Sequence, residues 1–577
     1  MTRLFNDPVA FADEMTDGFA AAYARYVRRV PGGVVRAEGA APGEVAVVIG
    51  GGSGHYPAFA GLVGPGVAHG AAMGDLFASP SAARAESVAR AADGGAGVLF
   101  CYGNYAGDVL NFTEAQERLR AAGVDVRTVL VTDDVSSAPP EARGRRRGIA
   151  GDLAVFKLAG AAAARGDDLD AVERIARRAN DRTRTLGVAF SGCTLPGADQ
   201  PLFRVPAGRM AVGMGIHGEP GISDDDLPTA DDLAALFVDR LIEELPDDVA
   251  TPAGGRVAVI LNGLGSVKYE ELFVVYRSIA RRLAEAGLTA VEPDVGEFCT
   301  SFDMAGASLT LVWLDEELEE LWRAPADTPA YRKSPSAVTR TVVESSGEAP
   351  AEEQRRAPGS EASQRAAVTV RSVLDAIAET LDAAADELGR LDAVAGDGDH
   401  GIGMRRGSLA AAEAARRGHG RGCGQVLTDA GDAWADKGGG TSGALWGTTL
   451  RTLGRHLGDQ DAPTPETVAA AVAQALAAVR RQGGAAPGDK TLVDAFAPFA
   501  EELTGRVAAG DPLATAWQAA AQVATAAADA TADLLPRLGR ARPHAGRSLG
   551  TPDPGARSFA LAMTAAAQRL RQNEAAS

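Results

Sequence analysis

The stretch VAVVIGGGSGHYP, residues 45–57, decides the fold of the first half of the chain. Its unbroken apolar run is typical of a strand that is buried on both faces between layers of helices. A glycine-rich turn follows directly, and such turns commonly let the backbone approach a phosphate or a small polar ligand. A dinucleotide-binding turn fits poorly, because Pro57 falls in the turn and no acidic residue ends a second strand at the usual offset. The stretch therefore predicts a buried strand that delivers Ser53 and His55 to a ligand.

Similar apolar runs recur through residues 1–328 and alternate with amphipathic helical segments, which predicts an α/β region. The further runs are GVLFCYG (97–103), VRTVLVTDD (126–134), RMAVGMGIHG (209–218), RVAVILNG (256–263) and ASLTLVWLD (307–315). A break rich in Pro, Asp and Gly lies near residues 240–255. We expect this break to divide the region into two α/β subdomains.

The pattern changes after this region. Residues 329–365 are dominated by Pro, Ser, Glu and Ala and keep no apolar period, which predicts a flexible linker. Residues 366–577 consist of Ala- and Leu-rich amphipathic segments separated by Gly-rich turns. They predict an all-α domain, which we expect to form a helical barrel.

Composition limits the partners of the chain. The 577 residues include 76 acidic and 57 basic side chains, a formal charge of −19, which argues against nucleic acid or an anionic membrane as the main partner. A phosphate ligand must then be held by backbone amides or bridging metal ions. The four cysteines are scattered, no run of 18 apolar residues exists, and the N-terminus does not resemble a signal peptide. We therefore expect a cytoplasmic protein with no disulfide framework, zinc site or membrane span.

The most specific chemistry lies in LDAVAGDGDHG, residues 391–401, which brings Asp392, Asp397 and Asp399 together between glycines. Three carboxylates this close repel one another unless a cation neutralises them, and oxygen ligands favour Mg²⁺ or Ca²⁺ over zinc. The spacing does not fit an EF-hand loop. The alternative is a solvated acidic turn.

A glycine-rich loop, KGGGTSGALWG (437–447), opens a helix further along the same domain. Backbone N–H groups at a helix N-terminus bind phosphate without a lysine, and Thr441 and Ser442 add hydroxyl donors. No G-K-[ST] follows, so the loop is not a Walker A motif, and a simple helix cap is the alternative. GDKTLVDAFAPF (488–499) and GRARPHAGRSLGTPDPGA (539–556) complete the pattern. Their Asp494 and Asp553 would otherwise be read as caps or surface charges; together the four segments predict a magnesium–nucleotide site.

Two further loops of the α/β region carry polar side chains. YGNYAGDVLNF (102–112) places Asp108 after a strand, and MGIHGEPG (214–221) places His217 in a glycine-rich loop. The chain has only seven histidines, so His55 and His217 in such loops are suggestive of a site. For either histidine alone, a structural role explains its position equally well.

These segments resemble a known family. GGGSGHYP, GNYAGDVLNF, RRGIAGDLAVFKLAGAAA, MGIHGEPG and TSFDMAGASLTLVWLD are similar, in this order, to the ketone-binding domain of dihydroxyacetone kinases. LDAVAGDGDHG, GGGTSG, GDKTLVDA and GTPDPGA are similar to the nucleotide-binding domain of the same enzymes. The resemblance covers nearly the whole chain outside the linker. A single fused chain implies the ATP-dependent branch of the family, not the branch that is phosphorylated by a phosphoenolpyruvate relay.

The resemblance implies a role for each motif residue. His217 is expected to hold the ketose as a covalent hemiaminal, while His55 and Asp108 contact the hydroxyl that is phosphorylated, with Asp108 the better candidate for the base. Substrate-binding residues are expected at Gly52, Ser53, Gly54, Tyr56 and Asn104. Asp392, Asp397 and Asp399 are expected to hold two Mg²⁺ ions that bridge the ATP phosphates. Nucleotide-binding residues are expected at His400, Gly440, Thr441, Ser442, Gly443, Thr491, Arg540, Asp553 and Gly555.

The resemblance also implies the reaction, which is ATP-dependent phosphorylation of a terminal hydroxyl of dihydroxyacetone or of D- or L-erythrulose. A homodimer through the ketone-binding domain is expected. Tyr56 replaces the glutamate that is usual in the family, so it either reshapes the substrate pocket or faces an interface without affecting substrate choice. The alternatives are an FMN-forming FAD-AMP lyase activity of the nucleotide domain, a non-catalytic regulator, and a phosphotransferase-system subunit. A regulator would be expected to lose His217 or the aspartates, and such a subunit would usually carry only one of the domains.

Overall fold

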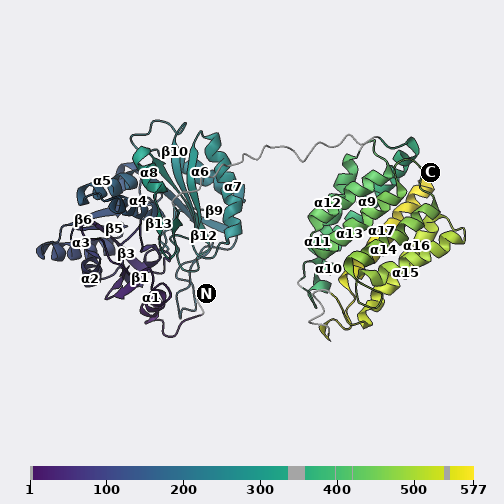
Figure 1. Cartoon of the computed structure of the whole chain (residues 1–577), viewed down its shortest axis with the longest axis horizontal. Helices are drawn as coiled ribbons and strands as arrows, with labels where there is room; N and C mark the ends of the chain where they lie inside the picture. The colour runs from purple at the N-terminus through teal and green to yellow at the C-terminus, as the bar shows by residue number, and fades with distance from the viewer. Residues whose placement is uncertain (1–3, 335–357, 397, 419, 539–545, 577) are drawn as a thin grey trace. The chain divides into compact units, whose positions relative to one another are not determined.

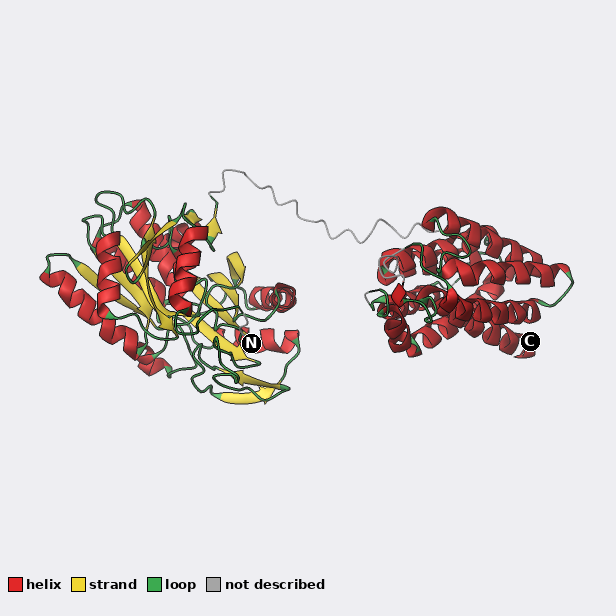
Figure 2. Cartoon of the chain, turned by 90° about the horizontal axis from the view of Figure 1, so that it is seen from below, coloured by secondary structure: helices red, strands yellow, loops and turns green. Residues whose placement is uncertain are grey.

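The computed structural model of the chain describes residues 4–334, 358–396, 398–418, 420–538 and 546–576. The chain forms two compact units, Met1–Thr341 and Val342–Ser577, which we call the α/β unit and the helical unit (Figure 1). Figure 2 shows strands in the α/β unit and a bundle of helices in the other. None of the described helices combines the length and the apolar composition that crossing a bilayer requires.

The first sheet of the α/β unit has the strand order β1-β2-β4-β3-β5-β6. Its strands are β1 (Val27–Val30), β2 (Gly33–Arg36), β3 (Ala46–Ser53), β4 (Gly70–Leu76), β5 (Val98–Gly103) and β6 (Val126–Val131). β3 is the central strand that the opening stretch predicts, and it pairs in parallel with both β4 and β5. Alternate residues of β3 face opposite layers: Val47 and Ile49 pack with α4 (Asp152–Arg165) and α5 (Leu169–Asp181). Val48 packs with α2 (Ala82–Ala92) and α3 (Ala106–Ala121) on the other face.

The second sheet has the order β11-β10-β12-β7-β8-β9 and is mostly antiparallel. Its strands are β7 (Thr183–Ala189), β8 (Arg209–Val212), β9 (Ser223–Asp226), β10 (Arg256–Gly263), β11 (Thr289–Gly296) and β12 (Gly306–Leu314). One face packs on α6 (Ala230–Ile242) and α7 (Tyr269–Glu285), and the other on α8 (Glu316–Arg323). The remaining described elements of the unit are α1 (Phe11–Ala22), the short 3-10 helices η1 (Ala60–Leu62) and η2 (Pro140–Arg145), and the small ribbon of β13 (Ala326–Asp327) with β14 (Arg332–Lys333).

The expected position of the division between the two α/β subdomains is wrong. Strands from both sides of residues 240–255 belong to the second sheet, so the chain passes from one sheet to the other between β6 and β7. The Pro, Asp and Gly residues of this break instead form the connection between α6 and β10. Turn-forming residues mark a loop, and they do not distinguish a connection within a domain from a boundary between domains.

The helical unit is a closed ring of helices. Its helices are α9 (Glu361–Ala383), α10 (Ala385–Asp392), α11 (His400–Arg417), α12 (Cys423–Gly438), α13 (Gly440–Leu457), α14 (Pro465–Gly483), α15 (Leu492–Ala508), α16 (Leu513–Ala530) and α17 (Pro554–Ala576). From α11 onward each helix packs against the next, and α9 closes the ring by contacting both α11 and α17. Trp434 and Trp446 stack at 4.6 Å between ring centroids inside an alanine-rich core. Small side chains let the helices approach closely, as the Ala-rich segments predict.

The predicted linker overlaps ordered elements at both ends. Strand β14 lies within residues 329–365, and α9 begins at Glu361, where the side chain of Ser360 accepts a hydrogen bond from the backbone N–H of Ser363. A serine N-cap stabilises a helix start that the composition of the segment hides. Residues 335–357, the centre of the predicted linker, lie outside the described residues.

Candidate active site and nucleotide pocket

Two histidines from distant parts of the α/β unit face each other. His55 follows β3, His217 lies in the loop between β8 and β9, and their Nε2 atoms are 3.0 Å apart. The Nδ1 atom of His55 lies 2.7 Å from the carbonyl oxygen of Thr300, and the Nδ1 atom of His217 lies 3.1 Å from Oε1 of Glu219. Each ring is thus fixed at one nitrogen and presents the other to its neighbour.

Aromatic rings enclose this histidine pair. Phe77 stacks on His55 at 4.8 Å, and Tyr105 meets the ring of His217 edge-on at 4.7 Å. Burial, together with the charge of His217, lowers the pKa of His55 to about 3. His55 is therefore neutral at physiological pH, so the ring can both donate and accept a hydrogen bond.

Asp108 is a buried acid in the first turn of α3. Among the described residues no hydrogen-bond donor reaches its Oδ1 atom. Burial raises the pKa of Asp108 to about 6, although Ser79 and the charge of His217 oppose the shift. An acid with such a pKa is well suited to take up a proton near neutral pH.

The glycine-rich end of β3 and the turn that follows it permit close packing around the histidine pair. A Cβ atom on Gly52 would lie 2.7 Å from the backbone nitrogen of Ala78, so the position accepts only glycine. Gly54 has a φ of +105°, a conformation that favours glycine. The hydroxyl of Ser53 donates a hydrogen bond to the carbonyl of Gly74 at 2.7 Å, and this bond ties the loop to β4.

The other two predicted substrate-binding residues make structural contacts. The Tyr56 side chain lies against α1, with its ring 6.1 Å from that of Phe19, and burial with the nearby Tyr23 raises the pKa of Tyr56 to about 12. The side-chain amide of Asn104 donates to the carbonyls of Gly144 and Arg146, at 3.2 and 2.8 Å. Asn104 thereby fixes the loop that leads into α4.

The polar groups that hold the two histidines are not among the predicted site residues. Glu219 contacts His217, and Arg147 lies between Glu219 and Asp134. The sequence did point to these two residues, because Glu219 lies in the motif MGIHGEPG and Arg147 lies in the motif RRGIAGDLAVFKLAGAAA. Thr300, whose carbonyl fixes His55, offers no such signal, because a backbone acceptor is available on any residue type.

The helical unit contains a pocket of about 650 Å³ at one end of its ring. It brings together predicted residues from four separate segments: Asp392, Asp399, His400, Gly440, Thr441, Ser442, Thr491, Asp553 and Gly555. Gly443 lies just inside α13, where a Cβ atom would come within 2.9 Å of the backbone of Gly438. Asp397 and Arg540 lie outside the described residues.

Asp392 organises the acidic loop. Its Oδ2 atom accepts hydrogen bonds from the backbone N–H groups of Gly398 and His400, at 2.8 and 3.4 Å. Within the described ranges, which omit Asp397, no three His, Cys, Asp or Glu side chains converge as a preformed metal centre. The carboxylates of Asp392 and Asp399 nevertheless line the same pocket, and an oxygen-only donor set of this kind suits Mg²⁺.

The glycine loop starts α13 at the pocket. Gly439 and Gly440 have φ values of +60° and +56°, and the helix begins at Gly440, so its first N–H groups have no intrahelical partners. The imidazole of His400 is shared between two hydroxyls, with Nε2 3.0 Å from Ser558 Oγ and Nδ1 3.4 Å from Ser442 Oγ. Burial lowers the pKa of His400, so the ring is neutral and both nitrogens can orient hydroxyls in the pocket.

Two acids of the remaining segments are helix caps, as the simpler interpretation of the sequence predicts. Asp494 forms a capping box with Thr491 at the start of α15, accepting from the Thr491 backbone N–H at 2.7 Å. Asp553 accepts from the backbone N–H of Ala556 at 2.7 Å at the start of α17. Burial raises the pKa of Asp553 to about 7. Asp553 also lines the pocket, so capping does not remove it from the ligand.

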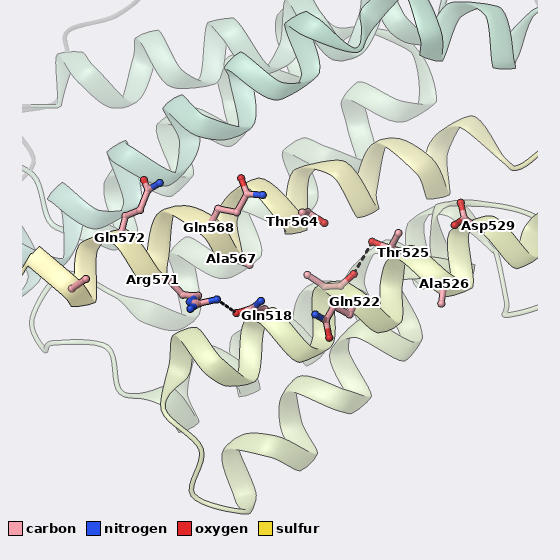
Figure 3. Close-up of a pocket in the computed structure, with 12 residues that line it drawn as sticks. Gln518, Gln522, Thr525, Ala526, Asp529, Thr564, Ala567, Gln568, Arg571 and Gln572 are labelled. Atoms are coloured by element: carbon pink, nitrogen blue, oxygen red, sulfur yellow. Dashed lines mark hydrogen bonds between the residues drawn. The ribbon is translucent and has the colours of Figure 1, made fainter.

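A second hollow, of about 730 Å³, lies between α16 and α17 (Figure 3). Figure 3 shows Arg571 donating to Gln518 across it. Its lining is mainly glutamine, threonine and alanine, and Asp529 is its only acidic residue among those described. It contains no glycine-rich helix start within the described residues, so the first pocket is better suited to a phosphate ligand.

Comparisons with known proteins agree with this arrangement. Residues 17–330 match the Dak1 domain and residues 394–568 match the DAK2 domain. The chain is 58% identical over 575 residues to an L-erythrulose kinase of Pectobacterium atrosepticum, covering 99% of this chain and 97% of the relative. It is 57% identical to a D-erythrulose kinase of Mycolicibacterium smegmatis, covering 97% of each.

A solved structure aligns with nearly the whole chain. The dihydroxyacetone kinase from C. freundii in complex with AMP-PNP and Mg²⁺ matches with a TM-score of 0.58 and 32% identity, covering 98% of this chain and 99% of that one. Both domain matches, the identities and the fold define a kinase. The chain belongs to the dihydroxyacetone kinase family.

Proposed function

We propose that the protein is an ATP-dependent kinase that phosphorylates a terminal hydroxyl of a short ketose, erythrulose or dihydroxyacetone. The observation that carries this proposal is the pair of facing histidines beside the buried acid Asp108, in a chain that also has a pocket suited to phosphate. The erythrulose kinases that share 57–58% identity with the chain support the four-carbon substrate.

On the ketose side, His217 bonds the substrate carbonyl and holds the ketose as a hemiaminal. An imidazole nitrogen adds reversibly to a ketone, so this device selects ketoses over polyols, which have no carbonyl. The buried position of Asp108 supports its role as the base that accepts the proton of the attacking hydroxyl. Gly52 and Gly54 allow the loop to approach the substrate closely, because neither carries a side chain.

On the nucleotide side, the free N–H groups at the start of α13 and the hydroxyls of Thr441 and Ser442 bind the phosphates. Asp392 and Asp399, with Asp397, hold Mg²⁺, for which carboxylate oxygens are the preferred ligands. When bound, the ions neutralise the developing charge on the phosphates. The chain's own residues position the nucleotide, and positioning is the main protein contribution to phosphoryl transfer.

We further propose the predicted organisation of the protein in solution, namely a ketone-binding domain (1–328), a linker (329–365) and a nucleotide-binding domain (366–577). The predicted homodimer and cytoplasmic location are part of the same proposal. Analytical ultracentrifugation tests the dimer, and a monomer at micromolar concentration contradicts it.

An ADP-release assay with Mg–ATP tests the proposed activity. Dihydroxyacetone, D-erythrulose, L-erythrulose and glyceraldehyde are compared, with glycerol as the control that lacks a carbonyl. We expect turnover with at least one ketose and none with glycerol. Absence of turnover with every ketose contradicts the proposal, and FMN formation from FAD with Mn²⁺ would then favour the lyase alternative.

A further inference from the structure

A chain of charged groups lies behind His217. Glu219 contacts this residue twice: Oε2 accepts from the backbone N–H of His217 at 3.0 Å, and Oε1 lies 3.1 Å from Nδ1. Arg147 lies 3.7 Å from Glu219 through Nη1, and it donates to Oδ2 of Asp134 from Nε and Nη2, at 3.0 and 2.8 Å. Burial raises the pKa of Glu219, but His217 and Arg147 outweigh it and the net pKa falls to about 2. Glu219 is therefore a carboxylate.

This geometry determines which nitrogen of each ring carries a proton. A carboxylate and a carbonyl oxygen can only accept, so the Nδ1 atoms that face Glu219 and Thr300 must both be protonated. Two neutral rings would then direct their Nε2 lone pairs at each other over 3.0 Å. One proton must therefore lie between the two Nε2 atoms before a ligand enters.

We propose that Glu219 is a positioning residue that keeps a proton on Nδ1 of His217 and so makes Nε2 the nitrogen that bonds the ketose. Arg147, anchored by Asp134, holds the carboxylate in place. This assignment rests on the proposed function of His217. Once the proton between the rings has left Nε2, an imidazole without a fixed partner at Nδ1 exchanges its two tautomers, and only one of them leaves Nε2 free.

The covalent step balances with the groups present. The proton leaves Nε2 of His217 and passes to the carbonyl oxygen of the ketose. The electron pair that the proton leaves on Nε2 forms the bond to the carbonyl carbon, and the carbonyl π pair becomes the O–H bond of the new hydroxyl, whose oxygen keeps its two lone pairs. The ring is cationic before and after the step, and the Glu219 carboxylate compensates this charge throughout. No external acid is consumed.

Glu219→Gln tests the assignment, because an amide cannot accept at both of its atoms. With its oxygen kept on the His217 backbone N–H, the amide directs its NH₂ group at Nδ1 and favours the proton on Nε2. The charged and titratable groups around His217 are His55, Glu219, Asp108, Arg147 and Tyr105. Of these groups the substitution changes only Glu219, whose negative charge it removes.

The measurement uses the full chain labelled with ¹⁵N in the histidine rings. The His217 signals, assigned by their loss in His217→Ala, are expected to show a protonated Nδ1 in the wild type. Glu219→Gln is expected to shift this pattern towards a protonated Nε2. It should also weaken ketose binding about tenfold or more by calorimetry without nucleotide, as for the loss of a charge-assisted hydrogen bond.

Glu44→Gln is the matched control, because it changes another carboxylate–histidine contact away from this site, in which Oε1 of Glu44 lies 3.0 Å from Nε2 of His69. It should leave the His217 signals and the ketose affinity unchanged. An unprotonated Nδ1 on His217 in the wild type overturns the proposal, and this result does not depend on whether Glu219→Gln folds. A folded Glu219→Gln in which Nδ1 of His217 keeps its proton also overturns it. A shifted tautomer with no ketose binding by the wild type upholds the role of Glu219 and instead overturns the proposed function of His217.

Discussion

Replacement of Asp108 by asparagine should lower the activity and raise the free energy of unfolding at neutral pH. The carboxyl is buried in the native state, where burial raises its pKa from 3.8 to about 6. A raised acid pKa means that the native state binds its proton more tightly than the unfolded state does. The ionised form is therefore destabilising. The cost is absent below about pH 3.8, grows between pH 3.8 and about 6, and is complete above that range.

The magnitude follows from the shift of roughly two pKa units, which corresponds to about 3 kcal/mol. The asparagine side chain carries no charge, so the free energy of unfolding of Asp108→Asn, relative to the wild type, should rise by about 2 kcal/mol between pH 4 and pH 8. Activity should move the other way. Loss of a general base typically costs about 10²- to 10⁴-fold, and the rise of kcat/KM through about pH 6 should disappear.

Two assays follow these opposite effects. Hydrogen exchange of peptides from β5 and β6 reports the stability of the α/β unit separately from that of the helical unit. ADP release with erythrulose from pH 5 to 9 reports the activity. Asp133→Asn is the control, because burial raises the pKa of Asp133 to about 6 as well, but its oxygens accept from the backbone N–H groups of Ile149 and Gly151. If Asp133→Asn removes the rise near pH 6 and Asp108→Asn keeps it, the assignment of the base is refuted.

Three further outcomes follow from the structure. Asp392→Asn should abolish Mg²⁺-dependent binding of a non-hydrolysable ATP analogue while calorimetry still detects ketose binding; retained nucleotide binding would exclude Asp392 as a ligand holder. Gly401→Ala would place a Cβ atom 1.9 Å from the carbonyl oxygen of Ala385 and should destabilise the helical unit by about 2 kcal/mol. At Gly505 nothing lies within 4 Å of the added Cβ atom, so Gly505→Ala should stabilise the unit by about 0.5 kcal/mol. Equal effects of the two substitutions in chemical denaturation would contradict the packing. Tyr56→Phe should leave the erythrulose-to-dihydroxyacetone ratio of kcat/KM within about twofold, because the ring packs against Phe19 of α1; a large change would show that the hydroxyl contacts substrate.

The sequence predicts those features whose cause is local. The run before His55 is a buried strand because each of its faces meets a layer of helices, and the glycines of 437–447 open a helix as expected. The alanine-rich segments after residue 366 become a ring because they have one apolar stripe each. In these cases the spacing of apolar residues along the sequence matches the spacing of the side chains that pack in the core.

Contacts that depend on tertiary proximity could not be predicted, even where the residues lie in recognisable motifs. Arg147 and Glu219 are far apart in the sequence and meet only because the loop before α4 and the loop after β8 converge. The carbonyl of Thr300 is invisible to any motif. The predicted domain boundary near residues 240–255 is wrong because the composition there indicates only a turn. The sheet to which β10 belongs depends instead on its pairing with β12. The acidic loop could be singled out from the sequence because its carboxylates are neighbours in the chain.

Intact mass spectrometry of the full chain with erythrulose, in the absence of nucleotide, tests the central claim most directly. The account predicts a mass increase equal to the whole ketose, which is reversed by dilution and absent in His217→Ala. No adduct on the wild type, or an adduct of equal abundance on His217→Ala, would contradict it.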